Sequence, residues 1–106
     1  MTINNMIKQK LIVIFSKKGL IRFISHLDLM RLFQRALRRA QLPIAFTCGF
    51  SPHPKMSFKK ALKLGLESEA EEASFYIDGW MNTEEFKMRL QGQLPEGITI
   101  KTVRAN

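Results

Sequence analysis

Two stretches with helical spacing of apolar residues are embedded among segments typical of strands. The first helix is expected over His26–Gln41, where apolar side chains recur every three or four residues and Ser25 begins a capping box. The second is expected over Glu84–Leu94, with Asn82 or Thr83 as its cap and acidic residues in its first turn.

Five segments are expected to form strands. The first is apolar on both faces through its middle, which predicts a strand near the centre of its sheet. The third alternates between two faces with a period of two residues. The set is Lys8–Ser16, Pro43–Cys48, Ser57–Leu66, Ala73–Trp80 and Ile98–Val103. Gly49–Lys55, with two prolines, is expected to be a loop, and Glu67–Glu72 an acidic turn.

The order strand, helix, strand, strand, strand, helix, strand predicts an α+β fold. It corresponds to the ferredoxin-like split βαβ arrangement in a single domain over residues 1–106. Right-handed crossovers then place both helices on one face of an antiparallel sheet with four to five strands. The opposite face stays open, and in this fold an open face often binds RNA.

Charge is distributed unevenly along the chain. The net charge is +8, from 17 Lys and Arg against 9 Asp and Glu; residues 1–66 carry +12 and residues 67–106 carry −4. Clustered basic residues favour a nucleic-acid partner, although a solubilising surface is the simpler alternative. The single cysteine, Cys48, allows no internal disulfide, and Leu11–Phe15 is too short to span a membrane. This run is also poorly placed for a secretion signal, because Lys17 and Lys18 follow it where small cleavage-site residues are expected. A cytoplasmic location is therefore expected.

The basic residues of the first part are expected to form one continuous surface, with the acidic residues mostly elsewhere. On the first helix, the spacing of the arginines predicts a stripe opposite the apolar face. Candidate phosphate contacts are Arg31, Arg35, Arg38, Arg39, Lys55, Lys59, Lys60 and Lys63. Candidate residues for stacking or for reading shape are His26, Phe50 and His53. The competing possibility is that the arginine stripe pairs with the acids of Glu67–Glu72.

The two histidines are candidates for acid–base chemistry at neutral pH. We expect His26 and the segment Ser51–Lys55 to lie close together and to form one pocket beside the first helix. The alternative is structural: His26 hydrogen-bonds the helix start or packs against the loop. A zinc site made from Cys48 and the two histidines would lack paired ligand spacing, so neither a metal nor a cofactor is expected.

Three motifs together resemble the radical SAM-linked protein family, a bacterial domain of unknown function (DUF2344). They are R-F-I-S-H-L-D-L-M-R from Arg22, G-F-S-P-H-P-K from Gly49 and L-G-L-E-S-E from Leu64. The resemblance covers about Lys10 to Gly97. Members are usually longer, so the chain is expected to be a shortened form or an N-terminal domain. The resemblance implies a role beside a radical S-adenosylmethionine enzyme that acts on RNA or a translation component.

Three functions remain open. The leading hypothesis is an accessory domain that binds RNA or presents a substrate to a radical SAM protein, without catalysis of its own. One alternative is a metal-independent RNA-cleaving enzyme that uses His26 or His53. The other is a protein-interaction module that docks by its acidic C-terminal part to a radical SAM partner. The iron–sulfur chemistry itself is excluded for this chain, because it needs three cysteines.

Overall fold

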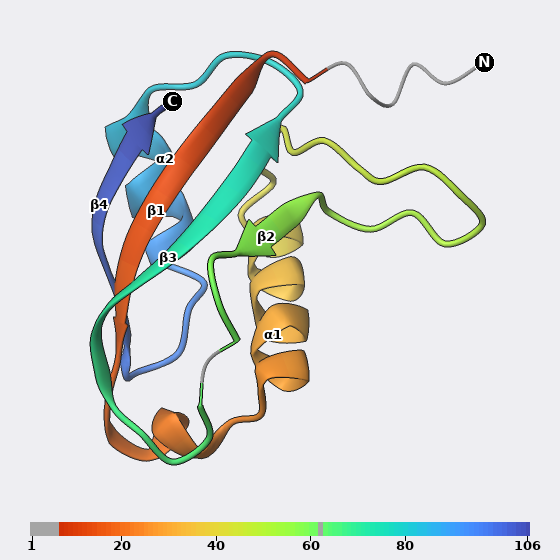
Figure 1. The fold of residues 1–106 in the computed structure, drawn as a ribbon. Helices are drawn as coiled ribbons and strands as arrows, with labels where there is room; N and C mark the ends of the chain where they lie inside the picture. The colour runs from red at the N-terminus through yellow and green to blue at the C-terminus, as the bar shows by residue number, and fades with distance from the viewer. Residues whose placement is uncertain (1–6, 62) are drawn as a thin grey trace.

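The computed structural model describes residues 7–61 and 63–106, which form one antiparallel sheet and two α-helices (Figure 1). The strands are β1 (Gln9–Lys17), β2 (Met56–Phe58), β3 (Ser68–Ile77) and β4 (Ile98–Ala105). The helices are α1 (His26–Arg39) and α2 (Thr83–Gln91), and a short 3₁₀-helix, η2 (Gly19–Phe23), joins β1 to α1. The strand order β2-β3-β1-β4 confirms the ferredoxin-like prediction.

β1 is an internal strand, as its apolar sequence predicts. It pairs antiparallel with β3 on one side and with β4 on the other. Leu11, Val13 and Phe15 are fully buried, and Ile12 on the opposite face is only 5% exposed. A strand with neighbours on both sides buries both faces more easily than an edge strand, which explains why this segment can be almost uniformly apolar.

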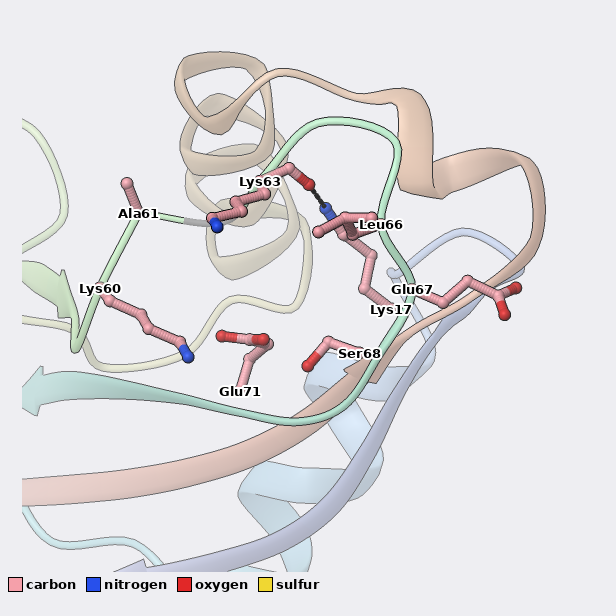
Figure 2. A pocket seen from close by; sticks show the side chains of 8 residues that line it. All are labelled: Lys17, Lys60, Ala61, Lys63, Leu66, Glu67, Ser68 and Glu71. Carbon is pink, nitrogen blue, oxygen red and sulfur yellow. Dashed lines mark hydrogen bonds between the residues drawn. The ribbon is translucent and has the colours of Figure 1, made fainter.

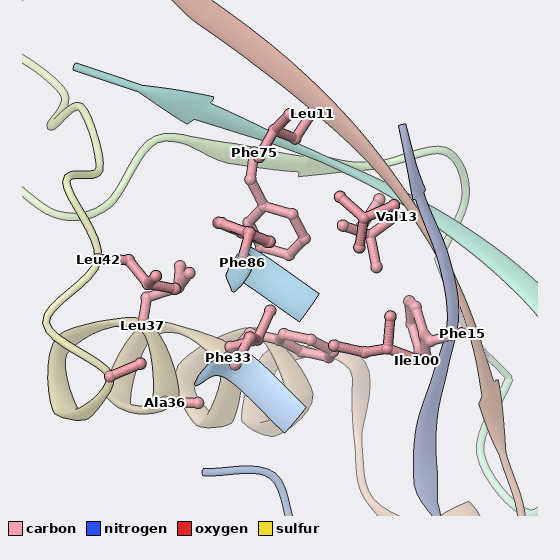
Figure 3. Packing of buried hydrophobic residues seen from close by; sticks show 14 of the residues in the cluster. Leu11, Val13, Phe15, Phe33, Ala36, Leu37, Leu42, Phe75, Phe86 and Ile100 are labelled. Atoms are coloured by element: carbon pink, nitrogen blue, oxygen red, sulfur yellow. The ribbon is translucent and has the colours of Figure 1, made fainter. Parts of the chain in front are cut away.

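Both helices cover the same face of the sheet, and Phe75 of β3 contacts each of them. Its ring centroid lies 5.8 Å from that of Phe33 on α1 and 6.0 Å from that of Phe86 on α2. Phe33 also lies 5.2 Å from Phe15 of β1 (Figure 3). Burying each of these rings stabilises the fold by roughly 1.5–3 kcal/mol. The aromatic cluster is therefore the centre of the core.

Both helices begin at the residues that the sequence indicates. Ser25 Oγ accepts a hydrogen bond from the backbone N–H of Asp28 at 3.1 Å. Asn82 Oδ1 accepts from the N–H groups of Glu84 and Glu85 at 2.8 and 3.1 Å. Both helices end two or three residues earlier than expected, at Arg39 and Gln91.

Two of the five predicted strands are much shorter in the structure. Pro43–Cys48 forms only isolated bridges, Ile44 to Ile77 and Phe46 to Pro54, and Ser57–Leu66 contributes only its first two residues to β2. For Pro43–Cys48 the reason is competition for the outer edge of β3. β2 occupies this edge along Ala73–Phe75, so only the chain at Ile44 and Ala45 reaches it, and Ala45 donates its N–H to Tyr76 O at 2.8 Å. After Phe58, the N–H of Lys59 still donates to Glu72 O at 2.9 Å before the chain leaves the sheet.

The predicted acidic turn over Glu67–Glu72 is also wrong, because β3 already begins at Ser68. Lysines of neighbouring segments balance the carboxylates there: Glu69 pairs with Lys18 and Lys101. Neutralised in this way, an acidic sequence can extend a strand. At the other end β3 stops at Ile77, so Trp80 lies outside the strand and is 74% exposed.

Candidate nucleic-acid interface

The outer face of α1 carries four arginines. Its buried positions, Leu29, Phe33, Ala36 and Leu37, all face the sheet. At 100° per residue the arginines fall on the opposite side of the helix, and all four are exposed: Arg31, Arg35, Arg38 and Arg39. We call these four residues the arginine ridge. Arg31 lies 3.5 Å from Asp28, and this is the one ion pair of the ridge in the described part of the chain.

Arg35 and Arg39 also line a groove between α1 and the end of α2. Its volume is about 370 Å³, and its other wall is residues 92–95. The guanidinium of Arg89 holds the two helices together, because its Nη2 donates to Ala40 O at 2.6 Å and to Gln41 O at 2.8 Å. These carbonyls end α1 and have no partner within the helix. Arg89 therefore fixes the position of the groove.

The lysines after β2 lie at a different place. Lys60 and Lys63 line a pocket of about 310 Å³ together with Lys17 and Glu71 (Figure 2). Lys17 is only 1% exposed, and its Nζ donates to Lys63 O at 3.0 Å. The sequence pattern predicts that the first strand ends at Ser16. β1 instead extends to Lys17, and the side chain of Lys17 is buried.

The acidic residues of β3 pair with lysines rather than with the arginine ridge. Besides Glu69, Glu72 lies 3.9 Å from Lys59, and Glu67 accepts a hydrogen bond from the N–H of Gly19 at 2.7 Å. Hydrogen bonds with Glu69 raise the pKa of Lys18, and those with Lys18 and Lys101 lower the pKa of Glu69. The expected separation of acidic from basic residues therefore holds at α1. It fails along β3, whose acids lie beside lysines of neighbouring segments.

The prediction that His26 and Ser51–Lys55 form one pocket is wrong. His26 begins α1 and its ring lies 5.4 Å from that of Phe58. The chain around residues 49–55 leaves the molecule near the opposite end of α1 (Figure 1). The contacts of His53 are within that loop: its N–H donates to Thr47 Oγ1 at 3.2 Å, and its Nδ1 lies 3.0 Å from Ser51 O. His26 and the loop of residues 49–55 therefore lie near opposite ends of α1.

The loop around His53 exposes Phe50 completely, whereas Pro54 is buried and bridges to Phe46. Lys55 lies at the base of the loop, directly before β2, where its N–H donates to Ala45 O at 2.8 Å and its carbonyl accepts from the N–H of Tyr76 at 3.3 Å. Of the three residues predicted to stack or to read shape, Phe50 is thus the most accessible.

The first and third sequence motifs meet at one corner of the molecule. The N–H of Gly65 donates to Arg22 O at 2.7 Å, and the guanidinium of Arg22 lies 4.4 Å from the centroid of the Phe23 ring. Large apolar side chains more than half exposed gather here: Leu20, Phe23, Leu64 and Leu66. We call these four residues the apolar corner. The sequence pattern does not reveal this corner, because the alternation around Leu64 and Leu66 predicts a strand.

The face of the sheet away from the helices contains a feature that the sequence analysis also missed. Tyr76 lies there between Lys10 and Lys55, whose Nζ atoms are 5.8 and 5.4 Å from the centroid of its ring. Alternation along the strand already distinguishes Tyr76 from the buried Phe75 and Ile77. Only the register between strands, however, places the two lysines beside it.

Within residues 7–61 and 63–106, no group of three or more His, Cys, Asp or Glu side chains is placed to hold a metal ion. In the same ranges no helix has both the length and the apolar character needed to cross a membrane.

Comparison with known proteins gives one match. The model of a family described as an uncharacterized protein conserved in bacteria (DUF2344) matches residues 10–106. No curated protein and no solved structure matches the chain significantly.

Proposed function

This chain belongs to the DUF2344 family of bacterial proteins, and on that premise we propose that it is an accessory RNA-binding domain. The observation that carries the proposal is the arginine ridge on α1, of which only Arg31 has an acidic partner among the described residues. Guanidinium groups bind phosphate oxygens through paired hydrogen bonds. Guanidinium groups that lie close together on one helix without acidic partners repel each other and destabilise the helix. A bound anion such as phosphate would offset this repulsion.

The dimensions of the ridge suit a nucleic-acid backbone. From Arg31 to Arg38 the helix rises roughly 10 Å, and successive phosphates of a single strand lie several ångströms apart. The groove beside Arg35 and Arg39 gives these side chains room to reorient toward a ligand. The ridge therefore supports contact with two or three phosphates at once.

A salt titration tests the proposal. The affinity for a fluorescein-labelled 12-nucleotide RNA is measured by anisotropy between 50 and 300 mM KCl; each phosphate contact on a single strand adds roughly −0.7 to the log–log slope. We expect Arg35→Ala with Arg38→Ala to weaken binding and to make the slope shallower by about one to two units. The variant with Lys87→Ala and Lys101→Ala removes the same charge from the α2–β4 side and serves as the control. Equal slopes for wild type and the ridge variant would overturn the proposal.

The radical SAM partner enters the proposal through the family resemblance, and the apolar corner supports a second candidate function. Soluble proteins rarely keep several large apolar side chains exposed together unless they bind a partner. The corner therefore favours a protein-interaction role, by this surface rather than by the acidic C-terminal part. We expect co-purification with a bacterial radical SAM protein to be lost in Leu20→Ser with Phe23→Ser. RNA binding by this variant should stay unchanged. Unaltered co-purification would remove this candidate.

The RNA-cleaving alternative, which uses His26 or His53 as acid or base, needs its own test. The test is incubation of end-labelled RNA with the protein in EDTA. Cleavage that is lost in His26→Ala and kept in His53→Ala would establish the enzyme alternative, whereas intact RNA supports an accessory role.

A further inference from the structure

The face of the sheet opposite the helices is a second candidate surface, and its centre is Tyr76. Neighbouring residues of β3 point the other way: Phe75 and Ile77 are fully buried in the core. Figure 1 views this face, with β1 and β3 in front of the helices. Among the described elements, no helix covers this side of the sheet.

The surroundings of Tyr76 are basic. Lys10 pairs with it across β1, and Lys55 lies on its other side, where the N–H of Tyr76 donates to Lys55 O at 3.3 Å. Arg104 of β4 stands opposite Ile12 and so belongs to the same face. The acid of β3 on this face, Glu72, lies beside Lys59. Two lysines thus flank the ring and Arg104 lies on the same face, while Glu72 is already paired with Lys59 and the exposed Asp78 follows directly after the strand.

We infer that this face binds single-stranded RNA by stacking an unpaired base on Tyr76, with Lys10, Lys55 and Arg104 contacting the adjoining phosphates. In the free protein the two ammonium groups lie near the ring, as cation–π contacts require. A base that stacks on the ring takes the place of these contacts and directs the ammonium groups toward its own phosphates. In a duplex the faces of the bases are covered by the neighbouring base pairs, so stacking on Tyr76 selects single strands over duplexes.

The inference rests on the proposed function, RNA binding, and adds the class of RNA and a second contact surface. The arginine ridge lies on the side of α1 away from the sheet, so the two surfaces are on opposite sides of the molecule. Substitutions at one surface therefore leave the other intact. Failure of the stacking surface and failure of the ridge give different results.

The first experiment compares Tyr76→Leu with Tyr76→Phe, using a labelled 12-nucleotide oligouridine and an RNA duplex of the same length. We expect Tyr76→Leu to weaken single-strand binding roughly 5- to 100-fold, the range for loss of one stacked base. Tyr76→Phe, which keeps the ring, should bind as wild type does. Duplex affinity should be the same in all three proteins. Thermal unfolding of each variant verifies that it is folded.

The second experiment needs no substitution. Oligouridine that contains 5-iodouridine is irradiated with the wild-type protein, and the crosslinked peptide is identified by mass spectrometry. A crosslink at Tyr76, the one tyrosine of the sequence, supports the inference. RNA binding that is unchanged in Tyr76→Leu, with crosslinks elsewhere, overturns the stacking surface and leaves the ridge standing. Absence of binding to either RNA overturns both proposals.

Discussion

Arg89 offers a direct test of how α2 stabilises the end of α1. Its guanidinium donates to two backbone carbonyls, Ala40 O and Gln41 O, and lies 3.4 Å from Glu85. A hydrogen bond from a charged donor contributes roughly 1.5–3 kcal/mol when shielded, and less where it is exposed. Only the bond to Ala40 O is partly buried, and the exposed pair with Glu85 adds little. We therefore expect Arg89→Ala to lower the free energy of unfolding by about 2 kcal/mol.

Urea denaturation followed by circular dichroism measures this loss. In thermal unfolding the same change corresponds to a decrease in Tm of roughly 10 °C for a domain of this size. Arg89→Met keeps the aliphatic stem and separates the hydrogen bonds from packing, so it should lose nearly as much as Arg89→Ala. Lys87→Ala is the matched control, because Lys87 donates one exposed hydrogen bond to Lys101 O. If Arg89→Ala and Lys87→Ala lose equal stability, the bridge between the helices contributes nothing.

Three further predictions follow from local geometry. Gly97 has φ +101°, and a Cβ there would collide with Lys18 O and the side chain of Ile21, so Gly97→Ala should cost more than about 2 kcal/mol in urea denaturation. Asn82→Ala removes the cap of α2 and should cost about 1 kcal/mol, while Asn82→Asp should cost less. NMR titration of Glu69 should give a pKa below 4.5, and the small stability it contributes is present above that pH, lost as the pH falls and reduced by salt.

The local pattern of the sequence was sufficient for the framework of the fold. Apolar spacing located both helices, and the polar residues Ser25 and Asn82 marked where they begin. The uniformly apolar β1 identified the central strand. These predictions succeed because capping, periodicity and burial act within one segment or one face.

Predictions failed where pairing between distant segments decides the outcome. The alternation over Ser57–Leu66 fits a strand, yet its pairing with β3 ends after Phe58 and the bond from the N–H of Lys59 to Glu72 O. The chain beyond this point leaves the sheet, and Leu64 and Leu66 become part of the apolar corner. Likewise, the acidic residues at the start of β3 predict a turn. In the structure they form part of a strand, because Lys18 and Lys101 from other segments balance the charge of Glu69.

The candidate binding surfaces divide in the same way. The sequence by itself determined the arginine ridge, because helical spacing alone places four arginines opposite the buried residues of α1. Only the tertiary structure separated His26 from His53, buried Lys17 and set Lys10 and Lys55 beside Tyr76. The physical reason is range: a helix face follows from neighbouring residues, whereas strand register and loop path depend on contacts between residues far apart in the chain.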